Sequence, residues 1–320
     1  LWDSLMVPGN WDTTEKYKTY SGKAYYQKSF NLPEQWRDKN IRLKFNAVYQ
    51  RAKVWLNGQL LGQHVGGYTP FEFNLTPYIN FTKTNSLVVM ADNSYQRGAW
   101  WAWGGISRDV SLSADNDVRL VYQHITAIPD FDQQTINYQI KYKLQNYSNK
   151  KQTVNITSSV QDNEQHKKQF SNTITLEGKS TGFKQIKFVD DLKNYQLWQL
   201  DNPYLYKLNS QISTQQQTID HKVDNFGIRK FEIRGEQFYF NNQAMRLNGL
   251  NRVHDHPDHG NTEPKVLVIR DMQDIKSLGG NFSRLMHAPL SKSLLDACDR
   301  LGYLVIGEIP VWGDDDPQSF

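Results

Sequence analysis

KVLVIRDMQDIKSLGGNFSRLMH, residues 265–287, joins a helical pattern to a strand-like one. A helix is predicted because apolar residues at helical spacing share one face, and these are Val266, Ile269, Met272 and Ile275. The glycine pair at 279–280 predicts where that helix stops. The run NFSRLMH (281–287) then has the length and apolar content of a strand.

The segments on either side continue this alternation. AMRLNGLN (244–251) predicts a strand before the helix, and SKSLLDACDRLG (291–302) predicts a second helix with a glycine at its end. YLVIGEIP (303–310) predicts a third strand. Strand, helix, strand, helix and strand in this order are typical of the start of a parallel α/β unit, which we place at residues 229–320.

Polar side chains gather where the predicted strands end. The three strand ends carry Asn251 to Asp255, Arg284 with His287, and Glu308. In a parallel barrel, the catalytic residues sit at the carboxyl ends of the strands. These positions are therefore the first candidates for a functional site.

Residues 1–228 have the pattern of two consecutive β-sandwiches. In residues 1–114, short strand-like runs alternate with turn signals, and Asn57-Gly58 between two runs is a strong hairpin signal. We expect an antiparallel sandwich of jelly-roll type there. In residues 115–228, alternating runs such as INYQIKYKLQNYS (136–148) recur, and about seven short strands predict an immunoglobulin-like sandwich.

The composition argues against several classes of protein. The net charge is only +4 and no block of Lys and Arg occurs, so we expect no nucleic-acid partner. No apolar run approaches the roughly 18 residues that a transmembrane helix needs, so we expect no membrane partner. The single cysteine, Cys298, lies in an apolar helical pattern and is interpreted as a small core residue.

Two further features leave alternatives open. The sequence begins at Leu1 with no visible signal peptide, which leaves the compartment undecided between several locations, the periplasm and the extracellular space included. Aromatic residues reach 13% and are densest in RGAWWAWGG (97–105). Aromatic faces pack against the C–H faces of sugars, so this enrichment fits carbohydrate binding, but it also fits the core of a large β-sandwich.

Motifs in a fixed order resemble glycoside hydrolase family 2, the family of β-galactosidases, β-glucuronidases and β-mannosidases. Three segments of this chain resemble the sugar-binding domain of that family: VPGNW (7–11), VWLNGQLLGQHVGGYTPFEFNLT (54–76) and GGISRDVSL (104–112). The end of its sandwich domain and the lead into its barrel resemble NPYLYKL (202–208) and NFGIRKFEI (225–233). The first three strands of its (β/α)₈ TIM barrel, with the helices between them, resemble LNGLNRVHDHPDHG (247–260), RDMQDIKSLGGNFSRLMHAP (270–289) and LLDACDRLGYLVIGEIP (294–310).

The resemblance implies a retaining exo-β-glycosidase that hydrolyses terminal β-linked sugars and needs no cofactor. Such an enzyme uses two carboxylates about 5–5.5 Å apart, one as acid/base and one as nucleophile. In the family both glutamates come after the third barrel strand, so both are expected beyond Phe320. No catalytic residue is therefore expected in residues 1–320, and this chain alone is predicted to be inactive. The resemblance is also compatible with assembly of the protein into a homo-oligomer.

Some positions depart from the family pattern and others match it. Val253 stands where galactosidases have a sugar-contacting histidine, and Ala99 where galactosidases and glucuronidases have a substrate-contacting aspartate. Trp312 and Asp314 occupy the positions of a magnesium-site glutamate and histidine of the large galactosidases. By contrast, RLMHAP (284–289) matches the family's R-x-x-H-x-P pattern, in which the histidine contacts sugar and the arginine helps to order the catalytic carboxylates.

NRVHDHPDHG (251–260) contains three of the eight histidines and has three interpretations. His254 and His256 could be metal ligands, but an H-x-H pair on a strand points to opposite faces and no Cys or Glu stands at ligand spacing. The stretch could also be a solvated structural loop. We favour a polar rim at the mouth of the barrel pocket, because the strand-end position and the resemblance both place it there and sugar hydroxyls need donors and acceptors.

The predicted substrate is therefore an oligosaccharide or another glycoside, and no metal site is expected. The predicted substrate-binding residues are Arg284, His287, His254, Asp255 and Trp101. The alternative function is a non-catalytic carbohydrate-binding module that uses an aromatic face around Trp100, Trp101 and Trp103. Packing in a core or a domain interface would explain these tryptophans equally well.

Overall fold

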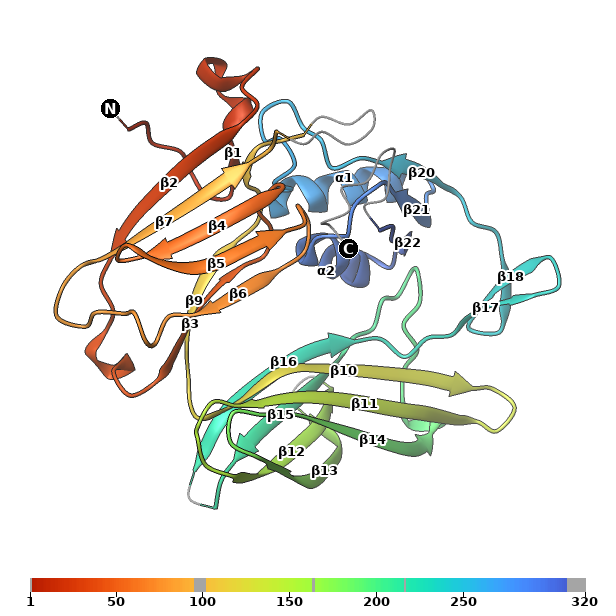
Figure 1. Ribbon diagram of the computed structural model, residues 1–320. Helices are drawn as coiled ribbons and strands as arrows, with labels where there is room; N and C mark the ends of the chain where they lie inside the picture. Colours follow the sequence, from red (N-terminus) through yellow and green to blue (C-terminus); the bar gives the residue numbers. More distant parts are fainter. Residues whose placement is uncertain (1, 95–101, 163–164, 216, 310–320) are drawn as a thin grey trace.

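The computed structural model of the chain describes residues 2–94, 102–162, 165–215 and 217–309. Three parts follow one another along the sequence: a β-sandwich from red to yellow, a second sandwich from yellow-green to cyan, and a blue part with helices and short strands (Figure 1). The predicted fold class, a jelly-roll sandwich, an immunoglobulin-like sandwich and the start of a TIM barrel, is confirmed.

The first sandwich packs a four-stranded sheet, β2-β7-β4-β5, against a three-stranded sheet, β6-β3-β9. Successive strand residues point to opposite faces, so alternate side chains of β3 and β4, such as Phe45 and Val54, fill the core between the sheets. Its strands are β1 (Gly9–Asn10), β2 (Lys23–Phe30), β3 (Asn40–Phe45), β4 (Arg51–Leu56), β5 (Gln59–Val65), β6 (Phe71–Asn74), β7 (Asn85–Asp92), β8 (Gly105–Ile106) and β9 (Val110–Asp115). Short 3₁₀ helices are η1 (Trp11–Thr13), η2 (Glu15–Tyr17) and η3 (Glu34–Trp36).

The turn between β4 and β5 confirms the hairpin predicted at Asn57-Gly58. Asn57 has φ +52° and Gly58 has φ +82°, and a two-residue hairpin turn of this type needs positive φ at both central residues. Leu56 pairs with Gln59 directly across the turn. Local sequence was therefore sufficient to define this hairpin.

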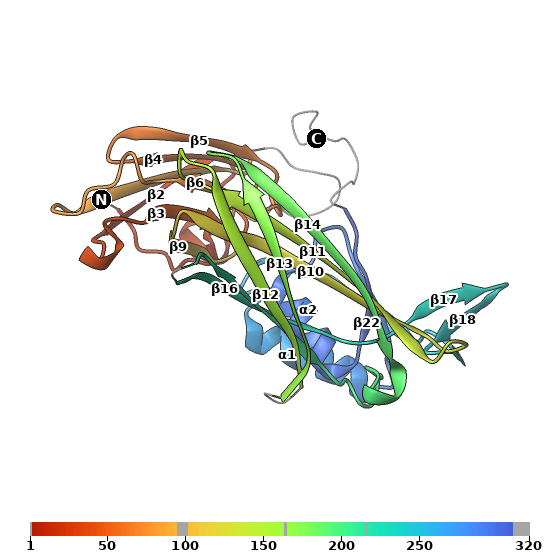
Figure 2. The same cartoon turned by 90° about the horizontal axis from the view of Figure 1, so that it is seen from below.

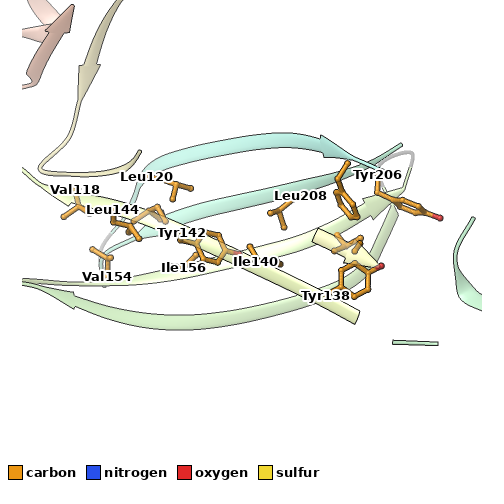
Figure 3. Packing of buried hydrophobic residues seen from close by; sticks show 14 of the residues in the cluster. Val118, Leu120, Tyr138, Ile140, Tyr142, Leu144, Val154, Ile156, Tyr206 and Leu208 are labelled. Atoms are coloured by element: carbon orange, nitrogen blue, oxygen red, sulfur yellow. The ribbon is translucent and has the colours of Figure 1, made fainter. Parts of the chain in front are cut away.

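The second sandwich packs the sheet β10-β11-β14 against the sheet β13-β12-β15-β16. Its core is built by alternation: Tyr138, Ile140 and Tyr142 point inward from β11 and are fully or almost fully buried (Figure 3). Its elements are β10 (Val118–Asp130), β11 (Thr135–Asn146), β12 (Gln152–Asp162), β13 (Gln165–Leu176), β14 (Thr181–Asp191), η4 (Leu192–Asn194), β15 (Tyr206–Ser213) and β16 (Thr218–Phe226).

The third part starts with a small antiparallel sheet and continues as a parallel one. The antiparallel strands are β17 (Phe231–Arg234), β18 (Gln237–Phe240) and β19 (Gln243–Met245). The parallel strands are β20 (Gly249–Arg252), β21 (Phe282–Leu285) and β22 (Leu304–Ile306), and the connecting helices are α1 (Lys265–Ser277) and α2 (Lys292–Leu301). Strand–helix–strand connections in a parallel sheet are the repeating unit of a TIM barrel.

The prediction of one continuous strand at 244–251 is wrong, because the segment contains parts of two strands in different sheets. β19 ends at Met245 and pairs with β18, whereas β20 begins at Gly249 and pairs with β21. Between them, Asn281 fixes the chain: its side-chain oxygen accepts from the Asn248 backbone at 2.9 Å and its backbone donates to the Asn248 carbonyl at 2.8 Å. A residue 33 positions away therefore decides where one strand ends and the next begins.

Helix α1 confirms the predicted helix but not all of its predicted buried face. Val268 and Met272 are fully buried and Ile275 packs beside them, whereas Val266 is 78% exposed. Residues spaced by four and three positions lie on one face, so Val268 belongs to the inward face and Val266 does not. The apolar character of Val266 was uninformative because several apolar residues begin this helix.

Helix α2 has the predicted glycine at its end and a serine cap at its start. The Ser291 side chain accepts a hydrogen bond from the Leu294 backbone at 3.3 Å, and Gly302 has φ +71° at the other end, where glycine carries no steric penalty. Cys298 lies in the core between α1, α2 and the parallel sheet, and burial raises the pKa of its thiol to about 12. The prediction of a core cysteine is confirmed.

Polar contacts join the barrel part to the second sandwich. Trp198 Nε1 donates to the Asp299 carbonyl of α2 at 2.7 Å, and Arg229, in the connection between β16 and β17, lies 3.2 Å from the Asp299 carboxylate. The Lys276 ammonium of α1 donates to the carbonyl of Leu200. Helix α2 lies beside β16, as Figure 2 shows from below.

Candidate functional site

The carboxyl ends of the three parallel strands meet at one edge of their sheet. β21 lies in the middle, with Arg284 opposite Asn251 of β20 and Ile306 of β22. Ser283 and Leu285 are buried toward the helices, so the alternation of the strand turns Arg284 to the opposite face. In a barrel that face is the interior, and its carboxyl end is where catalytic residues gather.

Glu308, two residues beyond β22, connects Arg284 with His287. Its Oε1 accepts from the Arg284 Nε, and its Oε2 accepts from the His287 backbone N–H at 2.9 Å and lies 3.1 Å from His287 Nδ1. The hydrogen bond from the His287 backbone and the Arg284 guanidinium lower the pKa of the Glu308 carboxyl, which is therefore ionised at neutral pH. The His287 and Glu308 side chains are 9% and 20% exposed, so this contact is partly shielded from water.

His254 and Asp255 lie in the seam between the first sandwich and the barrel part. His254 Nε2 is 3.3 Å from the Tyr68 hydroxyl, and the two rings meet edge to face. Asp255 Oδ1 accepts from Trp103 Nε1 at 2.9 Å. Burial lowers the pKa of His254 although the Asp255 carboxylate acts against it, so the ring is neutral at pH 7.

The segment 286–289 lies between these two groups. Met286 and Ala288, which flank His287, line a cavity of about 10 Å³ together with His254. Arg108 of the first sandwich donates to the Pro289 carbonyl at 2.7 Å and to the Tyr68 carbonyl at 3.3 Å. The first sandwich therefore contacts the loops after both β20 and β21.

Arg252, the last residue of β20, forms two ion pairs at the base of the 253–263 loop. Its guanidinium lies 2.7 Å from Glu263 and 3.0 Å from Asp271 of α1, and the Glu263 side chain is only 4% exposed. Burial alone would lower the pKa of Arg252, but the Glu263 and Asp271 carboxylates outweigh it and raise that pKa. These pairs tie the two ends of the loop together and to α1.

The two remaining histidines of 251–260 form a turn. The His256 backbone pairs with Gly260 in both directions, at 2.9 and 2.8 Å, and the rings of His256 and His259 lie 4.9 Å apart. His256 Nδ1 accepts from the Asp258 backbone at 3.1 Å. Since β20 ends at Arg252, the H-x-H pair lies in a loop, and the described ranges contain no group of three His, Cys, Asp or Glu side chains suited to a metal ion.

The predicted site residues thus fall into two groups. Arg284 and His287 come together through Glu308, which the sequence marked only as a polar strand end. His254 and Asp255 are held by Tyr68 and Trp103, 186 and 152 residues away in sequence, and nothing in the local pattern indicated these partners.

Several residues that carried predictions from the sequence lie outside the described residues. They are Ala99, Trp100, Trp101, Trp312, Asp314 and Phe320. The described ranges end at residue 309, so the third barrel strand is the last one whose geometry can be compared with the prediction. The sugar contact assigned to Trp101, and the placement of both catalytic glutamates beyond Phe320, therefore stay predictions.

Three family models, in an uninterrupted order, match nearly all of the chain. Residues 3–115 match the sugar binding domain of the glycosyl hydrolases family 2, residues 118–229 match the model named glycosyl hydrolases family 2, and residues 231–320 match its TIM barrel domain. In the described part of the chain, neither helix is long and apolar enough to cross a membrane.

Relatives and solved structures agree with these matches. A β-galactosidase of Thermoanaerobacter pseudethanolicus is 31% identical over 93% of this chain and 40% of its own length, and the β-galactosidase BoGH2A of Bacteroides ovatus is 31% identical over 90% and 34%. The crystal structure of a Bacteroides uniformis β-glucuronidase superposes with a TM-score of 0.90 at 27% identity, over 99% of this chain and 40% of that one. The chain therefore spans less than half the length of each of these three proteins.

Proposed function

The chain belongs to the glycosyl hydrolases family 2, and we propose that the complete protein is a retaining exo-β-glycosidase that releases terminal β-linked sugars. The observation that carries this proposal is the Arg284–Glu308–His287 cluster at the carboxyl ends of barrel strands, where the loops of such barrels line a pocket. Relatives named β-galactosidase and β-glucuronidase support the same class of reaction.

Retention requires two carboxylates about 5–5.5 Å apart, one to protonate the leaving oxygen and one to form the glycosyl-enzyme intermediate. We assign both to barrel strands that follow β20, β21 and β22 in the complete protein, beyond Phe320. The residues of this chain then bind and orient: His287 exchanges a hydrogen bond with a sugar hydroxyl, and Arg284 offers a planar pair of donors to a catalytic carboxylate.

His254, Asp255 and Trp101 are proposed to complete the substrate pocket on the side of the first sandwich. His254 and Asp255 are each anchored to that sandwich, by Tyr68 and Trp103. A substrate that reaches this side would meet a neutral imidazole and a carboxylate, which together can donate to and accept from hydroxyl groups.

A carbohydrate-binding module without catalysis is the less favoured alternative. It needs an open aromatic face around Trp103, but the indole N–H of Trp103 donates to Asp255 of the barrel part. An indole that is hydrogen-bonded across a domain seam acts as an interface residue. This contact supports one joint site over an independent binding module.

We propose domain limits at 1–114, 115–228 and 229–320. The first limit falls at the last residue of β9, Asp115, and the second lies between β16, which ends at Phe226, and β17, which begins at Phe231. Domain boundaries fall where few contacts cross the connecting segment. A change from one sheet to the next near each limit supports this division.

The function is tested with a panel of nitrophenyl β-glycosides that includes a galactoside, a glucuronide and a mannoside. We expect the complete protein to release nitrophenol from at least one of them, and residues 1–320 alone from none, because both carboxylates of the retaining mechanism are assigned elsewhere. NMR of the first sugar released should show the β-anomer. Turnover by residues 1–320 alone, or an α-anomer as the first product, would contradict the proposal.

Replacing His287 by alanine is expected to lower kcat/KM of the complete enzyme at least about tenfold, since one lost hydrogen bond to substrate costs about 1–3 kcal/mol. The melting temperature should change little, because His287 lies beyond the end of β21 and outside the core. The matched control is His259→Ala, an exposed histidine of the neighbouring loop. A His287→Ala enzyme that melts several degrees lower yet keeps its full activity would make this histidine structural.

A further inference from the structure

Glu308, which follows β22, gathers donors from β21 and from the loop after β21 on one carboxylate. One oxygen accepts from the Arg284 guanidinium, and the other is shared by the backbone N–H of His287 at 2.9 Å and His287 Nδ1 at 3.1 Å. The two hydrogen bonds from Arg284 and the His287 backbone N–H fix the ionised carboxylate, because charge-assisted hydrogen bonds are stronger than neutral ones. His287 Nδ1 lies within reach of the same carboxylate. Among the predicted site residues, Arg284 and His287 are the pair that this carboxylate orders.

The backbone of His287 indicates that this geometry is held against a local preference. His287 has φ +67°, a left-handed conformation that costs a non-glycine residue about 1–2 kcal/mol. Such conformations persist where the surroundings over-determine them, and they cluster at active sites and ligand-binding segments. The Glu308 carboxylate supplies such a contact, since it accepts from the backbone N–H of this very residue.

The contact at Nδ1 also decides what the imidazole ring can do. A neutral imidazole carries one N–H and one lone pair, and an ionised carboxylate can only accept. If Nδ1 donates to Glu308, the lone pair must be on Nε2, so Nε2 accepts hydrogen bonds. At Nε2, a ring held in this way would accept a hydrogen bond from a substrate hydroxyl and would not donate one.

We propose that Glu308 is a positioning residue, which fixes His287 in the Nδ1–H tautomer with Nε2 as an acceptor for a substrate hydroxyl and holds Arg284 in the orientation that a catalytic carboxylate requires. The proposal rests on the proposed glycosidase function for its activity readout, but the tautomer of His287 is a property of the chain alone. The proposed tautomer of His287 and the proposed glycosidase function can therefore be disproved independently of each other.

The first test measures the tautomer. Protein labelled with ¹⁵N-histidine should show His287 with a protonated Nδ1 and an unprotonated Nε2 at neutral pH, and its signals are assigned by their loss in His287→Ala. In Glu308→Gln the Nδ1–H form should lose its preference, because one amide oxygen cannot serve both Arg284 and His287. A wild-type His287 protonated at Nε2, or a tautomer unchanged by Glu308→Gln, would overturn the proposal whether or not the protein is a glycosidase.

The second test is a double-mutant cycle in the complete enzyme. Glu308→Gln should lower kcat/KM about tenfold in the wild-type background, and its effect should be at least about threefold smaller when His287 is already alanine, since coupled residues are not additive. Asp299→Asn is the matched control, because it weakens another Arg–carboxylate pair of the barrel part, with Arg229, on the helix side. Additive effects, or Glu308→Gln with wild-type kcat/KM, would overturn the positioning role, whereas an inactive wild-type enzyme would count against the proposed function only.

Discussion

Replacing Glu263 by glutamine is expected to destabilise the 253–263 loop by about 3 kcal/mol, near the lower end of the range for breaking a buried ion pair. Glu263 is 4% exposed at its side chain and lies 2.7 Å from the Arg252 guanidinium. Its removal leaves Arg252 with Asp271 alone, at 3.0 Å and more exposed to water. The nearby Arg108, whose pKa burial lowers, also loses a favourable carboxylate.

Hydrogen exchange of the amides in residues 249–263 is the suitable measurement, because a chain of several domains has no single free energy of unfolding. Their opening free energy should fall by about 3 kcal/mol in Glu263→Gln. The control is Asp296→Asn, which removes the exposed pair with Lys292 in α2 and should change protection by less than about 1 kcal/mol. Equal effects of the two substitutions would show that the Arg252 pairs do not hold the loop.

Replacing Ile140 by alanine is expected to lower the free energy of unfolding of the second sandwich by about 2–5 kcal/mol, since it removes buried apolar volume and leaves a cavity. Ile140 is fully buried at the centre of the core that Figure 3 shows. It lies opposite Ile125 of β10 and Ile186 of β14, both of which pack against the same core. These neighbours belong to regular strands, so they cannot collapse into the space.

This expectation is checked by thermal unfolding, monitored through the hydrogen exchange of the amides in residues 135–191. Phe183→Ala is the control on the neighbouring strand β14, because Phe183 is 67% exposed and its loss should cost about 1 kcal/mol or less. The specific activity of the folded complete enzyme should stay unchanged at 25 °C in both variants. A similar loss of stability in both would mean that burial at Ile140 does not dominate the stability of this sandwich.

Signals confined to a few neighbouring residues predicted their structures correctly. The Asn57-Gly58 turn and the Gly302 end of α2 each depend on the backbone preferences of one or two residues. The order of sandwiches, helices and parallel strands also followed from periodicity, since a period of two and a period near four are distinct in sequence.

Errors arose where a distant residue made the decision. The 244–251 segment has a continuous strand-like composition, but Asn281 hydrogen-bonds to Asn248 and separates two strands. In α1, several apolar residues could have faced inward, and contact with the sheet and α2 selected Val268 over Val266. The amino-acid composition indicates which residues prefer burial, but the packing of the folded chain determines which of them are buried.

The sequence by itself determined that this protein has two sandwiches before a parallel α/β part, and that polar residues collect at the ends of its parallel strands. Only the tertiary structure decided which of those residues contact one another and which lie in separate groups. Glu308 draws Arg284 and His287 into one cluster, whereas Tyr68 and Trp103 draw His254 and Asp255 into a domain seam. The physical reason is that backbone preferences act between near neighbours in the chain, whereas hydrogen bonds and ion pairs act between neighbours in space.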